Sequence, residues 1–233
     1  FARAKPVVVL KSGRTGFGAR AAASHTGAVA NDDAVFDVAV RQAGLVRARD
    51  LEEFLDVAKA FSYLPTPRGN RVAVVTYSGG VGALAADACA DLGLELATFS
   101  PPTADALRRS LPSARIVNPL DLFAVAPPAD YSDECLKALE CVTQDAGVDC
   151  VLLCLMVSRH VWQHDTGVVA RMAEVGRARP AVAWVIGDKG VVEETGRVLE
   201  EHGMPVFLSP ERAVRALARH AHSRRVQQRG ATR

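Results

Sequence analysis

Apolar residues in the second two-thirds of the chain fall into short continuous runs, and each run is followed by a segment in which apolar positions recur every three or four residues. A continuous run is typical of a strand buried on both faces, and the wider spacing is typical of a helix with one buried side. The pattern therefore predicts an α/β fold with a parallel sheet covered on both faces. The expected strands are 71–77, 95–99, 150–157, 181–187 and 205–208, and the expected helices are 80–92, 103–110, 166–178, 190–202 and 210–221.

The first third of the chain has a different pattern and is expected to form part of another α/β unit. Residues 7–10 are a short β-branched run, and the glycine- and alanine-rich stretch after them predicts a long loop that contains His25. Asn31 is expected to cap a helix over 32–43, and Asp50 is expected to cap a second amphipathic helix.

The segment LPTPRGN, residues 64–70, breaks the helical pattern and is the best candidate for a linker. The expected organisation is therefore one unit over 1–64, a second over 70–222 and a basic tail over 223–233. The tail is expected to be a frayed helix and a disordered end, the alternative being a contact with an anion or RNA. The chain opens on Phe1 and enters a core-type strand almost at once, so we expect it to belong to a longer protein.

Composition narrows the classes of partner. The 233 residues are 49% hydrophobic and 23% charged, with a formal net charge of +2 at pH 7, so the overall charge indicates neither a nucleic acid nor a membrane surface. The longest apolar run, 148–157, is far shorter than the roughly 20 residues that span a bilayer. Five unpaired cysteines fit packing roles in a reducing cytosol, and we expect a cytoplasmic protein.

The sequence TYSGGVG follows the expected strand 71–77 and opens a helix, so its backbone amides could point at an anion. Glycine permits close approach of a ligand to the backbone. The turn lacks the GK[ST] of a Walker A loop and does not match GxGxxG, so it remains either a phosphate cradle or a plain tight connection. Its residues are Ser78, Gly79, Gly80, Val81 and Gly82.

Two histidine patterns are ambiguous when read alone. His25 lies among small residues and could be a reactive group or an ordinary surface histidine. His160 and His164 have the spacing of two metal ligands on a helix, with Asp165 beside them, but the HExxH pattern of zinc proteases is absent. A solvated loop is favoured there, and no metal site is expected.

Residues 5–61 and 70–97, read together, resemble the nucleoside-diphosphate-forming acyl-CoA synthetases, relatives of succinyl-CoA synthetase. The specific segments are SHTGA, KSGRT upstream of it, and NPLDL at 118–122. The resemblance implies that 1–64 is the end of a succinyl-CoA-synthetase-like domain and that 70–222 is a flavodoxin-like domain. It also implies an enzyme that joins a carboxylic acid to CoA at the expense of ATP, through an acyl phosphate and a phosphohistidine.

By the match to SHTG, the resemblance implies that His25 is the transient phosphoryl carrier. Small neighbours leave room for the phosphoryl group and offer donors to its oxygens. The glycine turn at 78–82 is implied to stabilise the phosphorylated segment through the partial positive charge of a helix N-terminus. The neighbours are Ser24, Thr26 and Gly27, and the residues expected to support the turn are Asn118 and Asp121.

Parts of the family's machinery are expected outside this chain. Many relatives carry Asn at the position of Tyr77 and Pro at that of Val81, and neither change removes a backbone donor from the turn. The CoA-binding and ATP-grasp portions are the implied partners, and the full enzyme, expected to be an oligomer, would use CoA, ATP or ADP, and Mg²⁺, none of them tightly bound here. The alternative is a non-catalytic module of a protein acyltransferase that senses acyl-CoA or nucleotide, but such modules typically lack the histidine.

Overall fold

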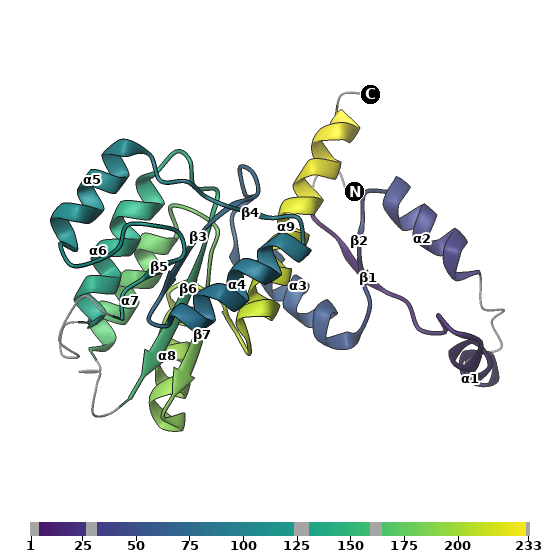
Figure 1. The fold of residues 1–233 in the computed structure, drawn as a ribbon. Helices are drawn as coiled ribbons and strands as arrows, with labels where there is room; N and C mark the ends of the chain where they lie inside the picture. Colours follow the sequence, from purple (N-terminus) through teal and green to yellow (C-terminus); the bar gives the residue numbers. More distant parts are fainter. Residues whose placement is uncertain (1–4, 27–31, 124–130, 159–164, 232–233) are drawn as a thin grey trace.

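In the computed structural model the chain forms two α/β parts joined at their helices (Figure 1). Residues 5–26, 32–123, 131–158 and 165–231 are described, except for the side chains of 25, 26 and 225–231. The first part has two parallel strands and three helices: β1 (Val8–Leu10), α1 (Gly16–Thr26), α2 (Asp33–Gln42), β2 (Val46–Ala48) and α3 (Leu51–Tyr63).

The second part is a twisted parallel sheet. Its elements are β3 (Arg71–Thr76), α4 (Gly79–Asp91), β4 (Glu95–Leu96), α5 (Pro101–Ser110), β5 (Leu120–Asp121), α6 (Tyr131–Gln144), β6 (Cys150–Val157), α7 (Thr166–Gly176), β7 (Ala181–Gly187), α8 (Lys189–Glu201), β8 (Val206–Phe207) and α9 (Pro210–Ala231). The strand order β4-β3-β6-β7-β8 corresponds to the 2-1-3-4-5 order of flavodoxin-like folds, which confirms the expected fold.

Strand alternation builds a separate core on each face of this sheet. One set of side chains from β3, β6 and β7 packs against α5, α6, α7 and α8, and the other set packs against α4 and α9. Because both faces are covered, nearly every residue of β3 and β6 is buried, as the continuous apolar runs predict. None of the described helices is both long enough and apolar enough to cross a bilayer.

Three local predictions are wrong. The stretch expected to be a loop around His25 contains α1, because its alanines are strong helix formers. The cap of α2 is Asp32, whose carboxylate accepts from the Ala34 amide at 2.7 Å, and not Asn31, which lies outside the described residues. The tail expected to fray from residue 223 continues α9 as far as Ala231.

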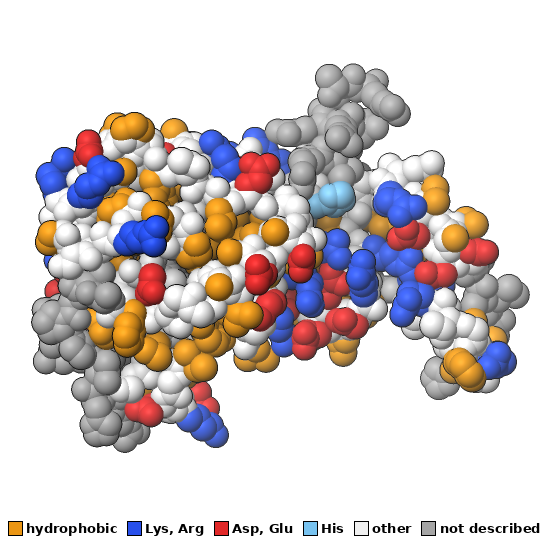
Figure 2. All heavy atoms as spheres, in the orientation of Figure 1, with side chains coloured by type: hydrophobic (Ala, Val, Ile, Leu, Met, Phe, Trp, Pro, Cys, Tyr) orange, Lys and Arg blue, Asp and Glu red, His pale blue; other side chains and the backbone are white. Residues whose placement is uncertain are grey.

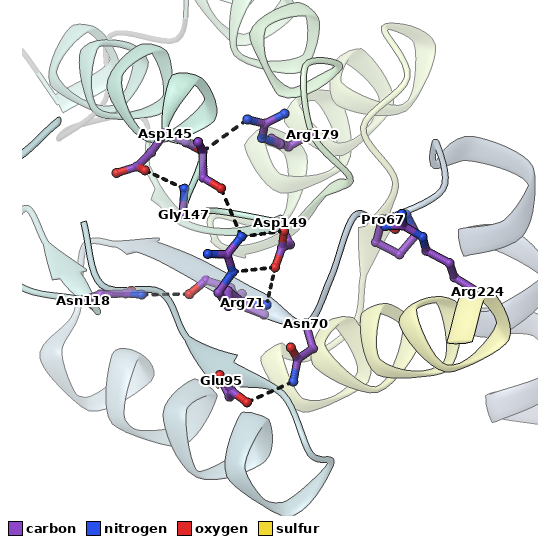
Figure 3. A network of polar contacts seen from close by, with 12 residues as sticks. Pro67, Asn70, Arg71, Glu95, Asn118, Asp145, Gly147, Asp149, Arg179 and Arg224 are labelled. Atoms are coloured by element: carbon purple, nitrogen blue, oxygen red, sulfur yellow. Dashed lines mark hydrogen bonds and ion pairs between the residues drawn. The ribbon is translucent and has the colours of Figure 1, made fainter. Parts of the chain in front are cut away.

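The linker is held on both sides. The carbonyl oxygen of Pro65 lies 2.9 Å from Nε2 of the buried His220, and that of Pro67 accepts from Arg224 (Figure 3). At its end, Arg71 donates through Nε to Asp149 Oδ2 at 2.8 Å and through Nη2 to Oδ1 at 3.1 Å. Burial raises the pKa of the Asp149 carboxyl, but the bonds from Arg71 outweigh burial and leave the pKa below its ordinary value.

The two parts meet along α3 and α9 through buried acids. Asp56, which is 6% exposed, accepts from Arg212 Nε and Nη2, both at 2.8 Å. Glu53, 2% exposed, accepts from Arg219 Nε at 2.7 Å. Arginine forms such two-pronged carboxylate contacts with defined geometry, so this junction fixes the orientation of α3 on α9.

Candidate functional site

The glycine turn lies where β3 ends and α4 begins, as expected for a ligand site at the carboxyl edge of a parallel sheet. Ser78 caps α4, and its Oγ accepts from the Val81 amide at 3.4 Å. The Gly82 amide donates to the Ser78 carbonyl at 2.9 Å. Within the described part of the chain, the amides of Gly79 and Gly80 have no hydrogen-bond acceptor. Two unbonded amides at a helix N-terminus favour an anion.

The three glycines of the turn lie in different surroundings. A Cβ on Gly82 would lie 3.1 Å from Pro119 Cβ, so this glycine allows α4 to pack closely on the segment after α5. A Cβ on Gly79 would lie 3.0 Å from Asp121 Oδ2. A Cβ on Gly80 would meet only Ser78 Oγ at 3.8 Å, so Gly80 faces open space. Only Gly80 combines an unbonded amide with unobstructed access.

Asn118 supports the sheet and does not touch the turn. β3 pairs with β4 at its start and with β5 at its end, which leaves a gap between the two short strands. The Asn118 side chain fills this gap: Oδ1 accepts from the Val74 amide at 2.9 Å, and Nδ2 donates to the carbonyls of Val72 at 2.7 Å and Ala97 at 2.9 Å. The side-chain amide thus replaces missing backbone pairs along β3.

Asp121 faces the start of α4. Its Oδ1 accepts from the Phe123 amide at 3.0 Å, and its Oδ2 is the atom that a Cβ on Gly79 would approach. A carboxylate is favoured beside a helix N-terminus. Asp121 therefore lies beside the turn, where its negative charge lowers the attraction of this site for a second anion. Its supporting role stays a prediction from the sequence.

The structure places the SHTG segment at the end of α1. His25 and Thr26 lie in the last turn of this helix, and Gly27 lies outside the described residues. The Ser24 hydroxyl donates to the Ala21 carbonyl at 2.8 Å, so it is already bonded within its own helix.

His25 and the glycine turn are not brought together in this arrangement. Figure 1 draws α1 at the outer end of the first part, below α2, while α4 lies against the sheet of the second part. The assignment of His25 to the turn therefore stays a prediction from the sequence.

Buried thiols and a phenol have no reactive character here. Burial raises the pKa of Cys89 to about 11 and that of Cys135 to about 12, so both thiols are neutral near pH 7. Burial also raises the pKa of Tyr77, which packs against Tyr131 with 4.8 Å between the ring centroids. Tyr77 is thus a buried residue that packs on α6 at the end of β3.

Comparison with known families and proteins decides the class of the chain. Residues 1–61 match the Succinyl-CoA ligase like flavodoxin domain, and residues 72–229 match the Ligase-CoA domain. The chain belongs to the Ligase-CoA family. The two matched segments meet at the 64–70 linker, and the resemblance drawn from SHTGA and the glycine turn is confirmed.

Curated relatives of this Ligase-CoA chain are ADP-forming ligases. Acetate–CoA ligase [ADP-forming] II of Archaeoglobus fulgidus is 37% identical over 92% of the chain, which spans 32% of that protein. The alpha subunit of acetate–CoA ligase [ADP-forming] II of Pyrococcus furiosus is 35% identical over 89% of the chain, which spans 45% of it. The chain thus covers less than half of each relative.

A solved structure has the same fold over nearly the whole Ligase-CoA chain. It is the dinucleotide forming acetyl-coenzyme A synthetase 1 of Ca. Korarchaeum cryptofilum in complex with phosphate and ADP, with a TM-score of 0.84 and 29% identity. The alignment covers 99% of this chain and 49% of that one.

Metal ligands do not gather in the described part of the Ligase-CoA chain. No group of three His, Cys, Asp or Glu side chains there could hold a metal ion. His160 and His164 lie outside the described residues, and Asp165 caps α7 by accepting from the Gly167 amide at 2.8 Å.

Sequence reasoning missed the ionic junction between α3 and α9. The signal was present as acidic residues on one side of α3 and arginines seven positions apart on α9, a spacing that keeps side chains on one face of a helix. Which helix would receive these arginines could not be read from spacing alone. The carboxylates are Glu52, Glu53 and Asp56, and the arginines are Arg212 and Arg219.

Gly80→Val in the complete protein is expected to lower the amount of phosphohistidine several-fold while changing stability by no more than about 1 kcal/mol, because the helix propensities of valine and glycine differ by less than that. The side chain would cover an open amide without displacing a neighbour. Acid-labile label and thermal unfolding measure the two effects. Gly196→Val on α8, where a Cβ meets nothing within 4 Å, is the matched control and should leave the label unchanged. Equal labelling of both variants would show that the turn is only a connection.

Proposed function

We propose that this chain is the phosphohistidine-bearing and Ligase-CoA portion of an ADP-forming acid–CoA ligase. The observation that carries the proposal is the pair of unbonded amides at the start of α4, in a chain that also presents the SHTGA segment. The names of the relatives, acetate–CoA ligases that form ADP, support the same reaction class.

The proposed reaction divides acyl transfer into three displacements. A neutral imidazole nitrogen of His25 attacks the terminal phosphorus of ATP, and the bond to ADP breaks. The carboxylate of the acid then takes the phosphoryl group from His25, giving an acyl phosphate. The thiol of CoA attacks the acyl carbon, loses its proton, and releases inorganic phosphate.

The role of this chain is to carry the phosphoryl group and to stabilise it. The amides of Gly79 and Gly80 would donate to phosphoryl oxygens, and the N-terminus of α4 would add an attraction of roughly 0.3 to 2 kcal/mol. These contacts require the end of α1 to approach the start of α4. We propose that CoA, nucleotide and Mg²⁺ are held by a CoA-binding portion and an ATP-grasp portion.

The test of this function is ADP formation by the complete protein. We expect repeated ADP formation, beyond the single ADP released when His25 is first phosphorylated, to depend on both CoA and a carboxylic acid. A panel of acids would name the substrate. A protein that binds acyl-CoA but forms no ADP with any acid would instead favour a sensing module.

The 233-residue chain alone is expected to form neither acyl-CoA nor ADP. Phosphoryl transfer depends on charge neutralisation by metal and cations, and the described residues offer no metal site. Coupled assays of ADP and thioester measure this directly. Adding the CoA-binding and ATP-grasp portions in trans should restore phosphate on His25, whereas robust ADP formation by the isolated chain would refute this division of labour.

A further inference from the structure

A groove of about 770 Å³ lies where the two parts of the chain meet. One wall comes from α2 and β2, and the other comes from α9 through Arg219 and His222. Small-molecule sites commonly have volumes of roughly 300 to 1,000 Å³ and occur at junctions between domains. Figure 2 shows basic and acidic side chains gathered over this junction.

Arginine dominates the lining of the groove. Five arginines line it against two carboxylates, those of Asp33 and Asp37. Asp33 Oδ1 accepts from Arg47 Nη2 at 2.5 Å, and Asp37 Oδ1 accepts from Arg47 Nη1 at 3.2 Å. Both carboxylates are therefore occupied, and Arg47 is held in a fixed position. The five arginines are Arg14, Arg41, Arg47, Arg49 and Arg219.

Two of these arginines have no carboxylate. Within the described part of the chain, the guanidinium groups of Arg14 and Arg49 make no ion pair or hydrogen bond, whereas Arg219 is paired with Glu53 at 2.6 Å. Both unpaired side chains are exposed at the edge of the groove. Among the described residues, neither guanidinium group is neutralised by a carboxylate in an ion pair.

Apolar residues also line the groove. They are Val40 and Val46, which are 4% and 2% exposed, and Leu45. Arginines together with apolar residues suit a ligand with a charged group and an uncharged body. Guanidinium groups bind phosphate oxygens through pairs of parallel hydrogen bonds, which favours phosphate as the charged group.

We propose that this groove binds the phosphate groups of a small phosphorylated molecule, with Arg14 and Arg49 as the contacting residues. The site is separate from the α4 turn and does not depend on the chemistry proposed for His25. Arg47 and Arg219 are already held in place by carboxylates. Their positive charges would attract the phosphate groups without any change in the position of these side chains.

Inorganic pyrophosphate is the probe, and isothermal titration calorimetry of the whole chain at low and high salt is the measurement. We expect one pyrophosphate per chain, with affinity falling as salt rises. The double variant R14Q/R49Q should weaken binding by at least about tenfold, since two charge-assisted contacts are lost. Both residues are exposed and unpaired, so folding should be unaffected.

R108Q/R197Q is the charge-matched control, because these exposed arginines lie on α5 and α8, outside the groove. This control should bind pyrophosphate with the same affinity as the parent chain. His25→Ala should do so too, and this result would separate the groove proposal from the proposed function of His25. Absence of saturable binding, or equal loss in the two double variants, would overturn the proposal. Loss of binding in His25→Ala would place the anion elsewhere and would also overturn it.

Discussion

Replacing His25 by alanine in the complete protein is expected to abolish the acid-labile, base-stable phosphate left by labelled ATP. Alanine has no nucleophilic nitrogen, so no phosphoramidate can form. Turnover should fall by orders of magnitude, since each later displacement needs the carried phosphoryl group. The neutral form of the imidazole is the nucleophile in this step.

The measurement is retention of label after base and its loss after acid, with turnover assayed in parallel. His202→Ala is a suitable control, because His202 ends α8 and its Nδ1 lies 2.9 Å from the Val198 carbonyl. The control should keep its label. Undiminished label in His25→Ala would remove His25 from the reaction.

Replacing Asp56 by alanine is expected to lower the free energy of unfolding by about 3 kcal/mol, because removing one partner of a buried ion pair leaves the other charge uncompensated. Asp56 is 6% exposed, and the side chain of Arg212 is 19% exposed. Glu52 keeps a contact with Arg212 at 2.9 Å, which places the expected loss toward the lower end for such pairs.

Urea or thermal unfolding of the whole chain measures this loss. Asp105→Ala is the matched control, because its pair with Arg108 is exposed on both sides and such pairs contribute less than about 1 kcal/mol. Similar losses in the two variants would mean that the α3–α9 junction does not hold the parts together. A second transition in Asp56→Ala alone would show that the parts now unfold separately.

Regular patterns in the sequence predicted the parallel sheet well. Each continuous apolar run became a strand of the second part, although the edge strands β4 and β8 are shorter than predicted. Local chemistry also predicted the cap of α3, where the Asp50 carboxylate accepts from the Glu53 amide at 2.7 Å. These features depend on residues that are close in the sequence, so one amino-acid sequence is enough to predict them.

Two helices were not predicted. α1 contains two glycines and no acid in its first turn, and its alanines carry little periodic signal. α6 was not predicted as a helix either. The buried face of α6 includes Ser132 and Thr143. These polar residues interrupt the apolar pattern in the sequence, and only the structure shows that they are buried.

In the candidate site, too, features set by neighbouring residues could be predicted and features set by distant residues could not. The turn, with its cap and its unbonded amides, follows from a strand, a serine and three glycines in one short segment. The role of Asn118 does not, because its three partners come from β3 and from Ala97, up to 46 positions away. The relation between His25 and the turn depends on the position of α1 relative to the rest of the chain, which spacing does not encode.

The ionic junction between α3 and α9, together with the held linker, limits what can move. If the two parts are fastened there, β1, β2 and α3 travel with the sheet of the second part as one body. Any approach of His25 to the turn must then arise between β1 and α2, the segment that carries α1. Under the proposed function, α1 would carry the phosphoryl group by moving relative to a rigid body formed by the rest of both parts. The rate of transfer would then depend on the movement of α1 and not on a hinge between domains.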